Sequence, residues 1–443
     1  MTERVKIIGG GLAGSEAGWQ LAQRGVEVAI CEMRPVRTTD AHQTDRFAEL
    51  VCSNSLKSDA HPSASWLLKE ELRRLDSLLL KAAATAQVPG GQALTVDRVR
   101  FADEVTQAIE SHPRITIERE EISEIDPAEL TIIATGPLTS ERLAESIGRL
   151  TGSNRLFFYD SISPIVDGST VDRSIAFAAS RYDKTLEGSG DGTGDYLNCP
   201  MNRAEYEHFI AELLAAQAVE SHIPNDVPYF EACLPIEEIA RRGPDTLRFG
   251  PMKPMGLEDP RTGRRPYAVV QLRQENLRAD SYNLVGFQNH LRFGEQKRIL
   301  RLIPGLEQAE FLRYGQIHRN TYINAPALLS PTLQLRSHPN IFFAGQISGV
   351  EGYVESIATG LAAGLFMEAH RRGEALRPLP RETALGSLCH YISHADPKRY
   401  QPANIAFDLF PLPDPNPRDR KERQTTICRI ALEKLDEYAA AYV

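Results

Sequence analysis

The chain has 443 residues, of which 42% are hydrophobic and 25% are charged. These values are typical of a soluble globular protein and exclude the collagen-like, disordered and disulfide-scaffold classes. At about 150 residues per domain, the length predicts two or three domains. The net charge of -9 argues against nucleic-acid binding unless positive charge is gathered locally.

The cysteine content and the start of the chain favour a cytoplasmic protein. None of the six cysteines forms a close sequence pair, which is typical of a reducing compartment. The N-terminus leads directly into a strand-like segment, without the charged and apolar leader of a signal peptide. No apolar run reaches the roughly 18 residues of a membrane span, so we expect no membrane partner.

The first forty residues predict a βαβ unit. Residues 5–8 form a short apolar strand pattern, and 15–24 form a helical one. Residues 26–31 are again strand-like and end at Glu32. Two parallel strands joined in this way need a covering layer of helices, which predicts an α/β fold.

The turn between the first strand and the helix has the pattern Gly9-x-Gly11-x-x-Gly14. These glycines allow a tight turn and close approach of a pyrophosphate to the helix N-terminus. Glu32 is placed to accept hydrogen bonds from ribose hydroxyls. The alternative is an ordinary tight turn between a strand and a helix. The expected cofactor contacts in this part are Gly9, Gly11, Leu12, Ala13, Gly14 and Glu32.

Further along the chain, leucines at helical spacing predict one long amphipathic helix over residues 63–86. A shorter helix is expected at 103–111. Residues 130–134 form another buried strand, which runs into Thr135 and Gly136.

The sequence pattern changes near residue 156, where short strand-like segments alternate with loops. Residues 186–195 are rich in glycine and predict a loop. Between Arg241 and Arg319 there are 15 Lys/Arg and 8 Asp/Glu, with aromatic residues interleaved. This stretch suits RNA, but a solvated basic face with core aromatics is an equally good interpretation. The candidate RNA contacts are Arg261, Arg264, Arg265, Arg273 and Arg292.

Near the C-terminus, residues 341–345 predict a buried strand and 352–369 a helix, and a final helix is expected over 423–442. The simplest layout is one nucleotide-binding domain built from both ends of the chain with a second α/β domain inserted. The predicted limits are 1–155 and 316–443 for the first domain and 156–315 for the insert.

Two segments favour FAD over NAD as the bound dinucleotide. Residues 132–136 resemble the strand that returns beneath the dinucleotide in flavoproteins of the glutathione-reductase type. Residues 343–360 resemble their C-terminal flavin segment, in which a helix aims its positive end at the flavin ring. The alternative is another strand and helix of the same fold. The contacts expected here are Ala134, Thr135, Gly136, Gly345, Gln346, Gly352 and Tyr353.

The cysteines argue against a flavin disulfide reductase, because Cys52 has no neighbouring cysteine to form a redox pair. For Cys52, Cys199 and Cys233 taken singly, a small buried side chain is the default interpretation and catalysis is the alternative. Cys389, His390 and His394 have a ligand-like spacing, but no second cluster completes a tetrahedral site, so we expect no metal.

Long, specific motifs cover nearly the whole chain, at residues 49–57, 230–237, 249–276, 282–297, 313–324, 344–360 and 391–404. Together they resemble the TrmFO family, the FAD- and folate-dependent tRNA (uracil-5-)-methyltransferases. The chain is also similar to the GidA-type tRNA wobble-uridine enzymes, which share the flavin domain but are longer.

This resemblance implies methylation of the T-loop uridine of tRNA at C5. The carbon would come from 5,10-methylenetetrahydrofolate, and FAD reduced by NADH or NADPH would supply two electrons. A thiolate that adds to C6 of uracil activates C5, and a base then removes the C5 proton. By resemblance Cys233 is the nucleophile, Cys52 the base and Cys199 a structural residue.

Three other functions remain open at this stage. One is a flavin-containing tRNA-binding protein in which FAD is only structural, and another is a GidA-like wobble-uridine enzyme. The weakest is an NAD(P)H–flavin oxidoreductase with a small substrate. The cysteines at positions 52 and 233 favour chemistry over binding, and the basic stretch favours an RNA substrate.

Overall fold

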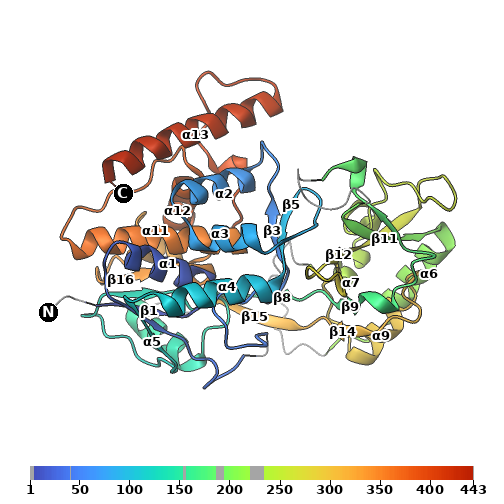
Figure 1. The fold of residues 1–443 in the computed structure, drawn as a ribbon, viewed down its shortest axis with the longest axis horizontal. Helices are drawn as coiled ribbons and strands as arrows, with labels where there is room; N and C mark the ends of the chain where they lie inside the picture. The colour runs from blue at the N-terminus through green and yellow to red at the C-terminus, as the bar shows by residue number, and fades with distance from the viewer. Residues whose placement is uncertain (1–3, 40, 153–155, 186–193, 220–233, 443) are drawn as a thin grey trace.

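The computed structural model describes residues 4–442, apart from 40, 153–155, 186–193 and 220–233, and it shows two lobes (Figure 1). One lobe contains both ends of the chain, and the segment drawn in green to yellow forms the other. Among the described residues, every helix is too short or too polar to serve as a membrane span.

A five-stranded parallel sheet forms the centre of the first lobe, in the order β16-β7-β1-β2-β6. Its strands are β1 (Val5–Ile8), β2 (Val28–Cys31), β6 (Ile115–Glu118), β7 (Thr131–Ile133) and β16 (Ile341–Phe343). Because β16 comes from the C-terminal part of the chain, this sheet confirms the expected Rossmann-like α/β fold, in which distant parts of the sequence share one sheet.

Two helices, α1 (Leu12–Gln23) and α11 (Tyr353–Arg371), pack closely against each other in this lobe. Glycine makes the close approach possible, because a Cβ on Gly360 would overlap the carbonyl oxygen of Ala13. The helix predicted from residue 15 begins three residues earlier, at Leu12, directly after the glycine turn. The N-terminus of α11 is brought to the same end of the sheet as that turn.

The long helix expected over 63–86 is wrong, because the structure has two helices there, α2 (Ala64–Arg74) and α3 (Leu78–Thr85). Asp76 between them has a left-handed φ of 63°. The Ser77 side chain accepts a hydrogen bond from the Leu80 N–H, and the buried Glu16 carboxylate accepts one from the Leu79 N–H. These two acceptors start a new helix, which the leucine pattern alone does not reveal.

The second lobe contains a six-stranded antiparallel sheet with its own hydrophobic core. Its order is β10-β11-β12-β13-β9-β14, formed by β9 (Ile165–Asp167), β10 (Phe177–Ala179), β11 (Tyr196–Met201), β12 (Ala268–Gln274), β13 (Ser281–Leu284) and β14 (Phe311–Arg313). The chain enters this lobe through β8 (Leu156–Ser161) and leaves it through β15 (Ile317–Tyr322), and these two strands pair as an antiparallel ribbon. The predicted domain limits of 1–155, 156–315 and 316–443 stay a proposal, which the two separate cores support.

The remaining elements surround these sheets. They are β3 (Ser55–Ser58), β4 (Gln87–Val88), β5 (Ala93–Val96), α4 (Arg98–Ser111), α5 (Glu141–Thr151), α6 (Arg203–Ala215), α7 (Ile236–Arg241), α8 (Thr246–Phe249), α9 (Phe293–Leu300), α10 (Ala325–Leu328), α12 (Ala384–His394), α13 (Arg420–Tyr442) and the short 3-10 helices η1 (Gly168–Thr170), η2 (Arg181–Asp183), η4 (Gln346–Ser348) and η5 (Phe407–Leu409). The predicted helices at 103–111, 352–369 and 423–442 are present and differ at their ends by five residues or fewer.

Candidate active site

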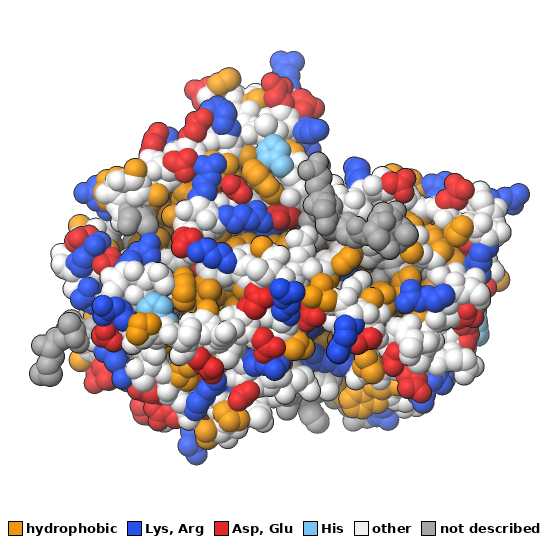
Figure 2. Space-filling view, in the orientation of Figure 1, with side chains coloured by type: hydrophobic (Ala, Val, Ile, Leu, Met, Phe, Trp, Pro, Cys, Tyr) orange, Lys and Arg blue, Asp and Glu red, His pale blue; other side chains and the backbone are white. Residues whose placement is uncertain are grey.

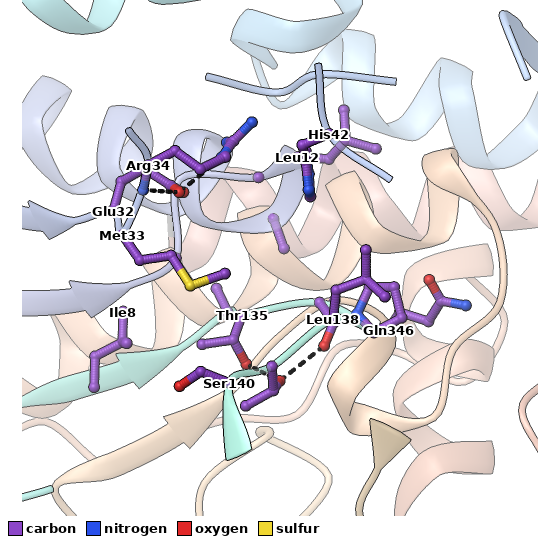
Figure 3. Close-up of a pocket in the computed structure, with 18 of the residues that line it drawn as sticks. Ile8, Leu12, Glu32, Met33, Arg34, His42, Thr135, Leu138, Ser140 and Gln346 are labelled. Atoms are coloured by element: carbon purple, nitrogen blue, oxygen red, sulfur yellow. Dashed lines mark hydrogen bonds and ion pairs between the residues drawn. The ribbon is translucent and has the colours of Figure 1, made fainter. Parts of the chain in front are cut away.

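An open cavity lies at the carboxyl ends of β1, β2 and β7, with about 990 Å³ of empty space that includes solvent at its mouth (Figure 3). In doubly wound folds this edge of the sheet is where dinucleotides bind. Most of the cofactor contacts expected from the sequence line it: Gly9, Gly11, Leu12, Ala13, Glu32, Ala134, Thr135, Gly136, Gly345, Gln346 and Tyr353. We call this cavity the dinucleotide cleft.

The three glycines of the turn have different roles in the structure. Gly9 has a φ of +107°, and a Cβ there would lie 2.5 Å from the carbonyl oxygen of Ala134. A Cβ on Gly14 would overlap the carbonyl oxygen of Gly9, so Gly14 lies behind the cleft and lets the helix approach the strand. A Cβ on Gly11 would meet no protein atom and would point into open space.

The N-terminus of α1 opens on this space without a capping side chain or an acidic residue in its first turn. Its free N–H groups and positive dipole end suit a pyrophosphate. The open side of Gly11 is the close approach that such a ligand needs. The turn therefore fits a bound dinucleotide.

Glu32 lies buried at the end of β2 and lines the cleft beside Arg34 (Figure 3). Its carboxylate accepts hydrogen bonds from the Gly10 N–H at 2.8 Å, from the Arg34 N–H at 3.0 Å and from Arg34 Nε at 2.8 Å. Burial opposes ionisation, but the hydrogen bonds and the charge of Arg34 outweigh it and hold the pKa of Glu32 below its usual range. A carboxylate has about four acceptor positions, so Glu32 keeps one for a ribose hydroxyl.

A second open cavity adjoins the cleft and shares Val51, Pro137, Leu138, Gln346 and Tyr353 with it. Its empty space of about 1040 Å³ includes solvent at its mouth. We call this second cavity the reaction pocket. Its other lining residues are Ala41, Cys52, Ser53, Ser55, Lys57, Ile162, Gln288, Asn320, Glu351, Gly352 and Asn404. Gly352, expected from the sequence to contact the cofactor, therefore lies on the side of this pocket.

Tyr353 connects the Cys52 segment to the start of α11. Its hydroxyl oxygen accepts hydrogen bonds from the Cys52 N–H at 2.7 Å and from the Ser53 N–H at 3.0 Å. Burial raises the pKa of Tyr353 well above its usual value, and a negative charge on Cys52 acts in the same direction. The phenol therefore stays protonated, and Cys52 is held where the reaction pocket meets the dinucleotide cleft.

Lys57 places a positive charge in the reaction pocket. Its ammonium donates to Glu355 Oε1 at 2.6 Å and to Asn404 Oδ1 at 2.5 Å. Glu355 is fully buried on α11 and also accepts a hydrogen bond from the Ile405 N–H. This network ties β3, α11 and the segment at 404–405 together around the pocket.

The other cysteines in the described residues do not line the reaction pocket. Cys199 is fully buried in the core of the second lobe, where burial raises the pKa of its thiol to about 12. The same cause raises the pKa values of Cys389 and Cys428 to about 12. These thiols stay protonated at neutral pH. Cys233, the expected nucleophile, lies outside the described residues.

Four of the five arginines expected to contact RNA are exposed. Pairing between residues 259 and 264 closes a turn that contains Arg261 and ends at Arg264. Arg265 directly follows this turn, and Arg292 lies just before α9. On the face seen in Figure 2, basic and acidic side chains are intermixed over both lobes.

Arg273 differs from this group and corrects the sequence-based interpretation. It is only 8% exposed, and its guanidinium donates to Asn54 Oδ1 at 2.9 Å and to Ser53 Oγ at 2.8 Å. A side chain buried between the lobes cannot contact an RNA phosphate. Arg273 instead belongs to the surroundings of Cys52.

The histidines that suggested a metal-ligand spacing, His390 and His394, stack face to face with ring centroids 4.0 Å apart on α12. Within the described residues, the candidate group of metal-ligand type is Cys31, Glu118 and Glu120. Burial raises the pKa of the Cys31 thiol to about 12, and Glu118 is already paired with Arg4. Neither group offers a set of free, deprotonated ligand atoms that converge on one point, as a metal site requires.

Sequence reasoning missed several residues of the site. They are Arg34, Lys57, Arg98, Arg313 and Asn404, each of which lines a cavity or contacts a segment that does. Arg34 could have been found, because it follows the strand end at Glu32 by two residues. Lys57, Arg313 and Asn404 lie within the motifs at 49–57, 313–324 and 391–404, which carry the family resemblance. Arg98 reaches the site through a long-range contact with Leu50 that no local pattern indicates.

Comparison with known proteins gives consistent matches along the chain. The family model described as "Glucose inhibited division protein A" matches residues 4–375. A protein from Solibacter usitatus (strain Ellin6076), named "Methylenetetrahydrofolate--tRNA-(uracil-5-)-methyltransferase TrmFO", is 68% identical over 100% of both chains. A protein of the same name from Koribacter versatilis (strain Ellin345) is 60% identical over 99% of both chains.

Among solved structures, GidA from Aquifex aeolicus is similar with a TM-score of 0.68 and 16% sequence identity. The match covers 98% of this chain and 74% of that chain. At this identity the likeness shows the fold alone.

Proposed function

The chain belongs to the TrmFO family of methylenetetrahydrofolate–tRNA-(uracil-5-)-methyltransferases, and from this premise we propose how its residues carry the reaction. The protein uses 5,10-methylenetetrahydrofolate to methylate C5 of uridine-54 in the T loop of tRNA, which gives ribothymidine. It is a flavoprotein, and bound FAD, reduced by NADH or NADPH, supplies the two electrons that turn a methylene into a methyl group. The relatives favour this activity over a non-catalytic flavin protein or a GidA-like wobble enzyme.

The observation that carries the proposal is the contact between the two cavities. The dinucleotide cleft and the reaction pocket share Gln346 and Tyr353, and Cys52 lines the pocket beside them. A uracil and a folate bound in the pocket would therefore lie next to the flavin end of the cleft. Held by Tyr353 at this junction, Cys52 is within the pocket in which the C5 proton must be removed.

We assign the proton-removing role to Cys52 and the nucleophilic role to Cys233. A thiolate that adds to C6 of uracil moves electron density onto C5, which then attacks the methylene carbon of the folate. A base must take the C5 proton before the carbon is reduced to a methyl group. The role of Cys233 is supported by its motif at residues 230–237.

The tRNA substrate is proposed to contact the exposed basic residues of the second lobe. Arg264 and Arg265 have exposed side chains, and so do Arg261 and Arg292, although Arg261 is paired with Asp259. Phosphate contacts of this kind add affinity without sequence specificity. The excess of Lys and Arg over Asp and Glu between Arg241 and Arg319 makes tRNA binding compatible with the overall net charge of -9.

The two cysteine roles can be separated with tRNA that carries 5-fluorouridine at the target position. Fluorine cannot leave C5 as a proton does, so attack by the nucleophile leaves a covalent protein–RNA complex. We expect Cys233→Ala to form no complex and Cys52→Ala to form it, with both variants inactive on normal tRNA. A complex formed by Cys233→Ala but not by Cys52→Ala would reverse the assignment, and ribothymidine formation by both variants would exclude thiol catalysis.

A further inference from the structure

The backbone around Cys52 is held by arginines from three different elements. Arg98 of α4 donates to the carbonyl oxygen of Leu50 at 2.8 Å and reaches that of Cys52 at 3.5 Å. Arg313 of β14 donates to the carbonyl oxygen of Val51 at 3.1 Å. With the Cys52 and Ser53 N–H groups bound to Tyr353, the polar backbone on both sides of the thiol has a partner.

Arg273 completes this arrangement from the second lobe. Its two hydrogen bonds reach Asn54 and Ser53, the residues that follow Cys52. Asn54 is fully buried, and its side-chain amide in turn donates to the carbonyl oxygens of Gln274 at 2.8 Å and Val96 at 3.0 Å. The segment at 53–54 and the end of β12 are therefore locked together across the boundary between the lobes.

The charges that face Cys52 come from several elements, and the hydrogen bonds of two of these groups, Arg273 and Arg313, go to neutral acceptors. Among the described residues, the charged or titratable groups that interact with Cys52 are Arg98, Arg273, Arg313 and Tyr353, and Lys57 and Glu351 line the same pocket. Glu275 forms an ion pair with Arg98 and offsets its charge. The hydrogen-bond acceptors of Arg273 are a neutral amide and a hydroxyl, and the Glu275 carboxylate offsets part of its charge without a hydrogen bond to it.

The attraction between Arg273 and a thiolate at Cys52 acts in both directions. Burial lowers the pKa of Arg273, and the negative charges of Tyr196, Glu275 and a thiolate at Cys52 oppose that shift. By the same interaction the guanidinium, which stays charged in proteins, favours the thiolate over the thiol. An uncharged side chain at position 273 would remove both the hydrogen bonds and this charge.

We propose that Arg273 is a positioning residue of the methylation reaction, which holds the Cys52 segment from the second lobe and places a positive charge beside the Cys52 thiol. The proposal rests on the role assigned to Cys52 above. It also gives the second lobe a part in catalysis, because β12 belongs to the same sheet as the rest of that lobe.

The test uses the full-length FAD-bound enzyme and three variants. Arg273→Met removes the charge and the hydrogen bonds, and Arg273→Lys keeps the charge but cannot make both bonds. Arg181→Met is the matched control, because Arg181 is a partly buried arginine that donates to Gln271 on the same strand but makes none of the contacts to residues 50–54. Iodoacetamide alkylation of Cys52 is followed between about pH 6 and 10 by mass spectrometry of its peptide, beside kcat and KM for tRNA.

We expect Arg273→Met to move the midpoint of Cys52 alkylation upward by about one pH unit or more, because one opposite charge at close range shifts a titration by that amount. The kcat of this variant should fall at least about tenfold, while KM for tRNA changes less than about twofold. Arg273→Lys should keep the alkylation midpoint near that of the wild type and still lose kcat. Arg181→Met should leave the midpoint unchanged.

An unchanged midpoint in Arg273→Met, or an equal shift in Arg181→Met, would overturn the proposal. Wild-type kcat in Arg273→Lys would overturn its positioning part, and the uncharged variant Arg273→Gln takes the place of Arg273→Met in the alkylation test if Arg273→Met does not retain FAD. The outcome is separable from the proposed function: full activity of Cys52→Ser would refute the role of Cys52 itself, whereas the alkylation midpoint tests Arg273 whether or not Cys52 is catalytic.

Discussion

Replacement of Gly11 by alanine separates cofactor binding from folding. Gly11 has φ -77° and ψ -164°, which alanine adopts without strain, and a Cβ there meets no protein atom within 4 Å. The added methyl group instead enters the space in which the pyrophosphate would lie. Crowding a filled site by one methyl group costs about 1–3 kcal/mol. Since each 1.4 kcal/mol is tenfold in affinity, the Kd for FAD should rise about 5- to 150-fold.

The assay is titration of the apoprotein with FAD, followed by flavin fluorescence, together with thermal unfolding of the apoprotein. Apo Gly11→Ala should unfold at the temperature of the wild-type apoprotein. Gly14→Ala is the contrasting variant, because its Cβ would overlap the carbonyl oxygen of Gly9 and should lower the unfolding temperature even without flavin. Wild-type FAD affinity in Gly11→Ala would refute the placement of the pyrophosphate at this turn.

Three further predictions follow from the site and the fold. Charge reversal at Arg264 and Arg265 should weaken tRNA binding and leave flavin reduction by NAD(P)H nearly unchanged. The slope of log binding constant against log salt concentration should become shallower by about 0.7–0.9 per lost phosphate contact, and an unaltered slope would contradict the proposed contact of these arginines with tRNA phosphates. The purified protein should release FAD and not FMN on denaturation, as chromatography of the released flavin would show. Burial raises the pKa of Glu71 from 4.5 to about 8, so the folded state holds a proton that the unfolded state releases. The free energy of unfolding should therefore fall as pH rises from about 5 to 8, and Glu71→Gln should make this free energy, measured by urea unfolding, less dependent on pH. An unchanged pH dependence in Glu71→Gln would refute the assignment to Glu71.

The parts of the fold that depend on residues close together in the sequence could be predicted from it. The glycine turn, Glu32 at the end of β2 and the strand before Thr135 are local patterns, and the structure brings them together around one cleft. The break at Asp76 could not be predicted in the same way. It depends on the buried Glu16 carboxylate, which reaches Leu79 from a helix about sixty residues earlier in the chain.

The same distinction applies to the site. Charge composition placed Arg273 among exposed basic residues, because a window of sequence cannot show which arginine faces inward. Its partners, Ser53 and Asn54, are more than two hundred residues away in the chain. Contacts between lobes of this kind are visible only once the inserted sheet is placed against the segment that carries Cys52.

The central claim is that this chain methylates uridine-54 of tRNA with a carbon taken from 5,10-methylenetetrahydrofolate. Its most direct test combines the purified enzyme, an unmodified tRNA transcript, NADH or NADPH, and methylenetetrahydrofolate labelled with ¹³C in the methylene group. Mass spectrometry of the digested tRNA should then show labelled ribothymidine at the T-loop position only when folate and NAD(P)H are both present. Formation of ribothymidine without labelled folate, or its absence from a complete reaction of the FAD-bound enzyme, would contradict the account.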